Sequence, residues 1–429
     1  MQFGINSYLR DSAMFENKKT YLNDEAKGKK LKNPVTADVH QRARAYRLQR
    51  VRDKLIENQC AAALLYDPVN IRYATDASNM QIWTAHNASR YAMVFAEGPV
   101  IIWEFHNCAH LCEHLETVDE VRNAINWAYF GAGPRVTEKA KEWAGEIVAL
   151  LKQHGGGNMR LAVDKMEPEG VPFLEAHGVK LVQGQMVLEQ ARAIKSEDEL
   201  ELMKWTIRVC EHGMQRMHDE LQPGMTENEL WAYLHFENIR HGGEWIETRL
   251  LASGPRTNPW MQESSDRVMQ EGEIIAFDTD MIGPYGYCAD ISRAWTVGHV
   301  PPTAEQRRLY SAAYEQIQHN MDILKAGMSF KEFVDKGWSI PDEFYKNRYC
   351  CVAHGIGMAD EYPAIAHAGN DWERAGYDGM FEEGMTICVE SCIAVEGGQE
   401  GIKLEEQVLI TKNGCVPLSS FKWEKDWLS

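Results

Sequence analysis

Residues 272–293 read GEIIAFDTDMIGPYGYCADISR and decide how the second half of this chain folds. Residues 273–277 form a short apolar run, which predicts a buried strand that ends on Asp278 and Asp280. Strand alternation places both carboxylates on one face. Gly-Pro and Tyr-Gly pairs at 283–286 predict a turn, after which a second strand brings Asp290 back alongside the first. The hairpin therefore gathers three carboxylates, whose mutual repulsion divalent cations would relieve.

Three further residues are candidate ligands because each lies at a strand end or in a turn. His354 lies in AHGIG, where the glycines let the backbone approach closely. Glu390 ends the apolar run MTICV, and Glu405 lies in IKLEEQVLI. Alternation sends Glu405 and Glu406 to opposite faces and does not choose between them. Singly, such residues are usually solvated or packed in a core, but five carboxylates and one imidazole together would suit two divalent ions.

The composition excludes several classes of function. The chain has 45 Lys and Arg against 63 Asp and Glu, a formal charge of -18, which opposes nucleic acid or an anionic membrane as a partner. No apolar run is long enough to span a membrane. The N-terminal segment lacks the basic start and apolar centre of a signal peptide, so we expect a cytoplasmic protein. The ten cysteines show no disulfide or zinc spacing and are expected to be free or buried thiols.

The pattern along the chain predicts three parts. Residues 1–37 are polar and Lys-rich and form an arm that is either mobile or laid over a neighbouring subunit. Residues 38–190 alternate helices (from 38, and 138–153) with strands (61–66, 91–95, 99–105 and 160–163), as in a small α/β domain. Residues 191–429 predict an α+β domain. Its helices are expected at 195–219, after the capping box Thr226/Glu229, and at 303–325, and its strands at 273–277, 385–390, 393–396 and 401–410.

From residue 193 to residue 411 the chain resembles the metallopeptidase family with the pita-bread fold, which includes methionine aminopeptidase, prolidase and creatinase. The matching segments are ARAIKSEDELELM, PGMTENEL, SGPRTNP, EGEIIAFDTD, YCADISRAW, AHGIG, the glutamate after EEGMTICV, and GIKLEEQVLIT. The α/β first half resembles the N-terminal domain of the prolidase and creatinase branch. By position, the family's five metal ligands fall on Asp278 (or Asp280), Asp290, His354, Glu390 and Glu405.

Three departures separate the chain from the peptidases. The hairpin offers Asp278 and Asp280, twelve and ten positions before Asp290 where the family has eleven, so a sixth ligand is available. The peptidase histidine seven positions after His354 is absent, and Trp260 stands near the place of another. The metal ligands are kept while the residues that handle an amide are lost, which disfavours peptide hydrolysis and also creatinase chemistry.

This combination is similar to the bacterial dimethylsulfoniopropionate lyases built on the same fold. The similarity includes the doubled aspartate DTD, HGIGMADEYP and NMQIWTAHNASRYAMVF. It implies β-elimination to dimethyl sulfide and acrylate, and we expect two divalent transition-metal ions, iron first, with zinc or manganese as alternatives. Asp360 is the candidate general base, and its alternative is a turn aspartate. Trp83, Tyr349 and Trp260 are candidates for a sulfonium pocket, against the simpler role of core packing.

Two other functions remain open at this stage. One is a prolidase-like metallohydrolase that cleaves an Xaa-Pro bond or a small amide. The other is a catalytically silent relative that binds a partner, for which six buried acidic and imidazole groups would be a costly feature. By resemblance we also expect a homodimer in which the N-terminal domain or arm of one chain reaches toward the site of the other.

Overall fold

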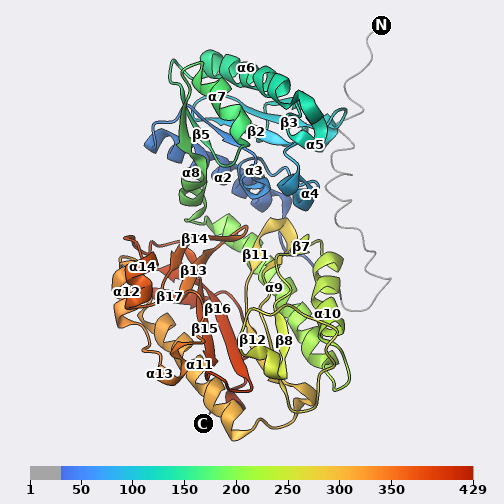
Figure 1. The fold of residues 1–429 in the computed structure, drawn as a ribbon, viewed down its shortest axis with the longest axis vertical. Helices are drawn as coiled ribbons and strands as arrows, with labels where there is room; N and C mark the ends of the chain where they lie inside the picture. The colour runs from blue at the N-terminus through green and yellow to red at the C-terminus, as the bar shows by residue number, and fades with distance from the viewer. Residues whose placement is uncertain (1–29, 429) are drawn as a thin grey trace. The chain divides into compact units, whose positions relative to one another are not determined.

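The computed structural model describes residues 30–428, so most of the predicted arm lies outside the described part. The chain forms two compact units (Figure 1). One is Thr36–Arg192. The other combines the chain from Ala193 onward with the described residues before Thr36. No helix of residues 30–428 is long and apolar enough to cross a membrane, and all ten cysteines are free, as predicted.

The first unit is a mixed sheet of six strands in the order β4-β3-β2-β1-β5-β6. The strands are β1 (Ala62–Leu65), β2 (Tyr91–Phe95), β3 (Val100–Glu104), β4 (Glu120–Asn123), β5 (Arg160–Val163) and β6 (Lys180–Gln183). The helices are α2 (Ala37–Glu57), α3 (Pro68–Thr75), α4 (Gln81–His86), α5 (Tyr129–Ala132), α6 (Val136–His154), α7 (Val171–Glu175) and α8 (Gly184–Arg192). Strands β1, β2 and β3 are buried along their whole length, which explains their continuous apolar runs.

The helices of the second unit are α9 (Glu197–Glu220), α10 (Glu227–Arg240), α11 (Ala304–Ile323), α12 (Phe330–Lys336), α13 (Asp342–Tyr345) and α14 (Asn370–Ala375). Two of them, α10 and α11, begin at the capping residues that the sequence predicts. The predicted caps at Thr226 and Thr303 are both formed as capping boxes, and Ser196 forms a third at the start of α9. In each box the side chains at the helix start satisfy free backbone amides of the first turn.

Three sheets form the interior of this unit. The strands are β7 (Trp245–Ile246), β8 (Leu251–Ser253), β9 (Ile274–Phe277), β10 (Met281–Ile282), β11 (Cys288–Ala289), β12 (Arg293–Thr296), β13 (Ala353–Ile356), β14 (Asp360–Ile365), β15 (Thr386–Ala394), β16 (Gly401–Thr411) and β17 (Gly414–Pro417). Their orders are β11-β10-β7, β12-β9-β8 and β14-β13-β15-β16-β17. Helix α11 packs along β15 and β16, and its apolar face joins the main core of the unit (Figure 1).

Two predictions about strands are wrong in detail. The hairpin of residues 272–293 is not one continuous ladder, because it is divided at its aspartates: β9 pairs with β12, and β10 pairs with β11 in a separate sheet. Asp290 lies in the gap of the returning chain and not in a strand. Conversely, the two strands predicted at 385–390 and 393–396 are the single strand β15, whose polar Ser391 is buried and donates a hydrogen bond to Gln316.

The described end of the N-terminal segment packs on the second unit of its own chain. The backbone amide of Leu31 donates to Nε2 of His241 over 3.0 Å, and Asn33 donates to the hydroxyl of Tyr285 over 2.7 Å. Leu31 and Val35 also contact the hydrophobic cluster around α9 and α10. Helix α2 then begins at Ala37, the last residue assigned to the arm.

Candidate metal centre

The six predicted ligands come from five segments of the second unit and meet in one place. Asp278 follows β9, Asp280 precedes β10 and Asp290 follows β11, while His354, Glu390 and Glu405 lie on the neighbouring strands β13, β15 and β16. All six are buried. Their ligand atoms form overlapping groups within 4.8 Å of one another: Asp278, Asp280 and Asp290; Asp278, Glu390 and Glu405; and Asp290, His354, Cys388 and Glu405.

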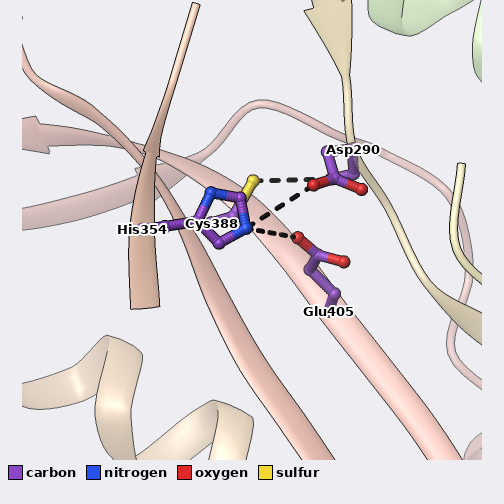
Figure 2. Close-up of side chains that lie close together, drawn as sticks. All are labelled: Asp290, His354, Cys388 and Glu405. Carbon is purple, nitrogen blue, oxygen red and sulfur yellow. Dashed lines mark hydrogen bonds and ion pairs between the residues drawn. The ribbon is translucent and has the colours of Figure 1, made fainter. Parts of the chain in front are cut away.

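Sheet register explains how these residues converge. His354 lies opposite Cys388 in the β13/β15 pair, and Glu390 lies opposite Glu405 in the β15/β16 pair. Figure 2 shows the imidazole of His354 directed at the carboxylates of Asp290 and Glu405, with the Cys388 thiol beside it. Nε2 of His354 is 3.6 Å from Asp290 Oδ2, 3.3 Å from Glu390 Oε1 and 3.6 Å from Glu405 Oε1.

The donor atoms fit a pair of divalent cations. Oε1 of Glu390 and Oε1 of Glu405 are buried and make no well-aligned hydrogen bond with the described residues, although Nε2 of His354 lies 3.3 Å and 3.6 Å from them. A buried carboxylate oxygen without a donor is costly unless a cation binds it. Carboxylate oxygens with one imidazole nitrogen are ligands suited to manganese, iron or zinc. Glu406 lies on the other face of β16 and pairs with Arg293 over 2.7 Å, so Glu405 is the glutamate that joins the group.

Asp280 reaches this group through an unusual backbone conformation. Its φ of 34° lies in the left-handed region, which residues other than glycine seldom adopt. The hydroxyl of Thr248 donates to Asp280 Oδ2 over 2.6 Å and holds the side chain. This conformation interrupts the strand between β9 and β10, and it is the physical reason for the division of the predicted hairpin.

The crowding of carboxylates shifts their protonation. Burial, followed by the neighbouring charge of Glu405, raises the pKa of Asp278 to about 7 and that of Glu390 to about 7. Burial opposes the charged imidazole of His354, but its contacts with Glu390 and Glu405 outweigh that effect and raise its pKa. Without cations, several of these groups would have to share protons near neutral pH.

Two residues that the sequence reasoning missed complete the interior of the site. The ammonium of Lys403, which is fully buried, lies 3.0 Å from Asp278 Oδ2, 2.7 Å from Glu390 Oε2 and 2.9 Å from Glu405 Oε2. It also donates to the hydroxyl of Ser292 over 2.7 Å. A signal for Lys403 was present, because it precedes Glu405 by two positions in one strand and so shares its face.

Asp360, the candidate base, is the first residue of β14 and lies beside His354. Its Oδ1 is 3.8 Å from His354 Nδ1, and 58% of its side-chain surface is exposed. Loss of solvation and the charge of Glu405 raise its pKa, while His354 acts in the opposite direction. The next residue, Glu361, is buried in an ion pair with Lys195, and a Cβ at Gly357 would collide with its carboxylate. Because its carboxylate is paired with Lys195, Glu361 is not placed to do what the peptidase histidine does at this position.

The three aromatic candidates are placed differently. The ring of Tyr349 lies 4.5 Å from the ammonium of Lys403, at the edge of the carboxylate group. Trp260 is 9% exposed and packs in the main core of the second unit, where its indole N–H has no hydrogen-bond partner among the described residues. Trp83 lies on α4 of the first unit, with its ring 5.3 Å from that of Phe105.

Comparison with known families matches both halves of the chain. Residues 201–412 match the description metallopeptidase family M24, and residues 47–194 match the creatinase/prolidase N-terminal domain. Curated relatives extend the match over most of the chain. A protein of Roseovarius nubinhibens is 42% identical over 389 residues, which cover 90% of this chain and 87% of the relative.

The chain belongs to metallopeptidase family M24. The Roseovarius relative is named dimethylsulfoniopropionate lyase DddP, as is a protein of Roseobacter denitrificans that is 42% identical over 89% of this chain and 86% of its own length. Among solved structures, the prolidase of Thermococcus sibiricus aligns with a TM-score of 0.69 at 20% identity, covering 89% of this chain and 98% of that one. The M24 fold, with its creatinase-like N-terminal domain, is therefore as the sequence predicts.

Proposed function

We propose that this protein is a metal-dependent lyase that splits dimethylsulfoniopropionate by β-elimination into dimethyl sulfide, acrylate and a proton. The observation that carries the proposal is the buried group of five carboxylates and His354 with Asp360 beside it, in a chain that has Glu361 where M24 peptidases have a histidine. The 42% identity to two proteins named as lyases of this substrate supports the same reaction.

The metal-binding part of the proposal uses six residues: Asp278, Asp280, Asp290, His354, Glu390 and Glu405. They would hold two divalent transition-metal ions, iron first, with zinc or manganese as alternatives. When bound, the ions would attract the substrate carboxylate and withdraw electron density, which makes the neighbouring C–H bond more acidic. The unsatisfied oxygens of Glu390 and Glu405 are the atoms in this set most in need of a cation.

Asp360 is proposed to remove the proton next to the substrate carboxylate. It is the acid of this group with the most exposed side chain, so a substrate can reach it, and its raised pKa makes it a better base than an ordinary aspartate. As the proton leaves for Oδ1 or Oδ2, the C–H electron pair forms the double bond of acrylate. The C–S bond breaks at the same time, and sulfur leaves as neutral dimethyl sulfide.

The sulfonium end of the substrate calls for aromatic faces in place of a counter-ion. A soft cation is attracted to the electron-rich face of an aromatic ring, most strongly where water is excluded. Tyr349 is the proposed contact nearest to the carboxylate group. Trp260, which packs in the main core of the second unit, and Trp83 stay candidates on the resemblance alone.

An Xaa-Pro hydrolase is the second candidate, and the match to a metallopeptidase family favours it. Amide hydrolysis needs a group that protonates the departing nitrogen. In this chain the position seven residues after His354 holds Glu361, whose carboxylate is already paired with Lys195. The hydrolase is therefore the less favoured of the two.

The test is gas chromatography of the headspace above purified, metal-loaded protein given dimethylsulfoniopropionate. We expect dimethyl sulfide from the wild type and almost none from Asp360→Asn. The matched control is Asp335→Asn, an exposed aspartate of α12 that pairs with the exposed Lys331 and should leave activity unchanged. Release of proline from an Xaa-Pro dipeptide without any sulfide would replace the lyase by the hydrolase.

A further inference from the structure

Lys403 is a fully buried cation in the middle of the proposed metal ligands. Lysine is rarely buried completely unless its charge is paired, and here three carboxylates and one hydroxyl surround the ammonium at 2.7–3.0 Å. Its three N–H bonds can all be satisfied by these four oxygens. The ring of Tyr349 covers it at 4.5 Å, and water has no access to it.

The ligand groups define three places where a cation could sit among these carboxylates. One lies between Asp278, Asp280 and Asp290, and a second lies between Asp290, His354, Cys388 and Glu405. The third lies between Asp278, Glu390 and Glu405, and these are the three carboxylates that the ammonium of Lys403 contacts. One of the three places is therefore filled by the protein itself, and two are left for ions.

We propose that Lys403 is a built-in third cation that fixes the composition of the centre at two divalent ions. The five carboxylates Asp278, Asp280, Asp290, Glu390 and Glu405 carry five negative charges, and Lys403 cancels one of them. Four remain, which two divalent ions neutralise while His354 binds as a neutral imidazole. This inference rests on the metal-binding part of the proposed function and is independent of the substrate.

Lys403 also determines which oxygens face the ions. It holds Oε2 of Glu390 and Oε2 of Glu405, so that the Oε1 atoms of the same two residues face Nε2 of His354 and make no well-aligned hydrogen bond within residues 30–428. The hydroxyl of Ser292 lies 2.8 Å from Asp278 Oδ1 and 2.9 Å from Glu405 Oε2 and links these groups. Lys403 is thus a positioning residue that acts through the glutamates, as partners of ligands commonly do in metal sites.

The experiment compares wild-type protein with Lys403→Met, which removes the charge, and Lys403→Arg, which keeps it. Each protein is stripped with a chelator and reloaded with Mn²⁺. Two quantities are measured: the number of ions per chain by elemental analysis, and Tm with and without the metal. No substrate is needed, so failure of the lyase assay leaves this test intact.

We expect two ions per chain in the wild type and in Lys403→Arg. In Lys403→Met the stripped protein should lose several degrees of Tm, because three buried carboxylates lose their counter-charge. Metal should restore much of that loss, so the rise in Tm on loading is larger than in the wild type. A purely structural role for the lysine would lower Tm equally with and without metal.

Three results would overturn the inference. A Lys403→Met protein with the wild-type ion count and the wild-type rise in Tm would show that the charge is not used. Three ions per wild-type chain would show that the lysine gives way to metal. A wild type that binds no ion at all would remove the proposed centre on which the inference rests.

A second variant covers the case in which Lys403→Met does not fold. Lys403→Met combined with Glu390→Gln removes one positive and one negative charge, so the balance of the stripped protein is that of the wild type. We expect this double variant to be soluble and to have a higher metal-free Tm than the single one. A double variant no better folded than Lys403→Met would contradict the charge argument.

Discussion

At the scale of single residues, Asp360 combines exposure with a raised pKa. The base must be deprotonated to act, so kcat/KM should rise with pH through the pKa of Asp360 and then level off. Because that pKa is raised, the rise should be centred above the ordinary aspartate value of about 3.9. Asp360→Asn should lower kcat by roughly 10²–10⁴-fold, the usual contribution of a general base. A pH–rate profile of the wild type and the kcat of the variant test both statements.

Cys350 and Cys351 form an adjacent pair with opposite reactivity. A hydrogen bond from the Cys351 thiol, followed by the charges of Lys403 and His354, lowers the pKa of the exposed Cys350 to about 6. The pKa of Cys351 is raised. Iodoacetamide at pH 7 should therefore alkylate Cys350 first, with a rate that follows a titration near pH 6.

Peptide mapping by mass spectrometry measures this selectivity, with the partly exposed Cys108 as an internal reference. Cys351→Ala removes the hydrogen-bond donor and should move the titration of Cys350 to higher pH. Equal labelling of Cys350 and Cys108 would contradict the prediction.

Single residues also show where sequence reasoning stops. The six candidate ligands were named through the resemblance to the family, whose motifs match this chain in order and spacing. Lys403 was not, because a lysine inside a strand usually lies on a solvated face. Its place two positions before Glu405 was a signal, but its role became evident only from the burial of both faces of β16. Alternation alone did not choose between Glu405 and Glu406. The resemblance named Glu405, and the structure agrees, since Glu406 pairs with Arg293 on the other face.

At the scale of elements, the start of α9 is tied to the hairpin that carries the aspartates. The hydroxyl of Ser196 accepts from the backbone amide of Glu199, and the amide of Ser196 donates to the Glu199 carboxylate over 2.9 Å. The other oxygen of Glu199 accepts from the hydroxyl of Tyr287 over 2.9 Å. The helix cap and the hairpin therefore share one buried carboxylate.

Ser196→Ala should destabilise the protein by about 1 kcal/mol, the usual cost of a lost N-cap. Ser196→Asp keeps an acceptor at the cap and is the matched control, with stability near that of the wild type. Urea denaturation of the three proteins measures the difference. If Ser196→Asp is destabilised as much as Ser196→Ala, the cap is not the source of the effect.

Helices and strands were predicted best where a capping residue or an apolar run marks their ends in the sequence. Caps at Thr226 and Thr303 located two helices, and strands β2 and β5 have the bounds that their apolar runs predict. The hairpin was predicted as one continuous ladder because the alternation of apolar and polar residues does not reveal a left-handed backbone conformation such as that of Asp280. That conformation is maintained by contacts with distant residues, including Thr248, which a local pattern does not contain.

At the scale of the whole molecule, the first unit has its own buried charge network. The side chain of Asp76 is 7% exposed and pairs with His40 at 3.1 Å, Arg47 at 3.0 Å and Arg44 at 3.3 Å. Burial alone would raise the pKa of Asp76, but the charges of His40 and Arg47 hold it well below the ordinary value. Asp76→Asn should cost about 3–5 kcal/mol, since it leaves buried cations without their partner.

The same network sets the acid stability of this unit. The folded pKa of Asp76 lies below its unfolded value of about 3.9, so its contribution is complete above that pH and is lost as pH falls through the folded pKa. Asparagine also tolerates the left-handed conformation of Asp76, φ 68°, so the variant removes the charge without straining the backbone. Thermal melts between pH 3 and 7 should show a weaker pH dependence in Asp76→Asn.

The division into two units predicts how the molecule responds to metal removal. All proposed ligands lie in the unit that starts at Ala193, and the unit Thr36–Arg192 has a separate core. Chelation should therefore lower the melting temperature of one calorimetric transition and leave another in place. A single transition that moves as a whole would mean that the units unfold together.

The mass in solution, measured by light scattering, tests the expected homodimer.

The burial of β16 on both faces has a consequence for how the chain reaches its final alignment. Along this strand, Lys403 and Glu405 face the carboxylate group, while Glu406 faces Arg293. A slip of one residue against β15 would turn Lys403 and Glu405 away from that group, and Glu406 away from Arg293. Each misplaced charge would be buried without a partner. The ion pairs on the two faces therefore favour one alignment of β16 over its neighbours, because a shift by one residue buries charges on both faces without partners.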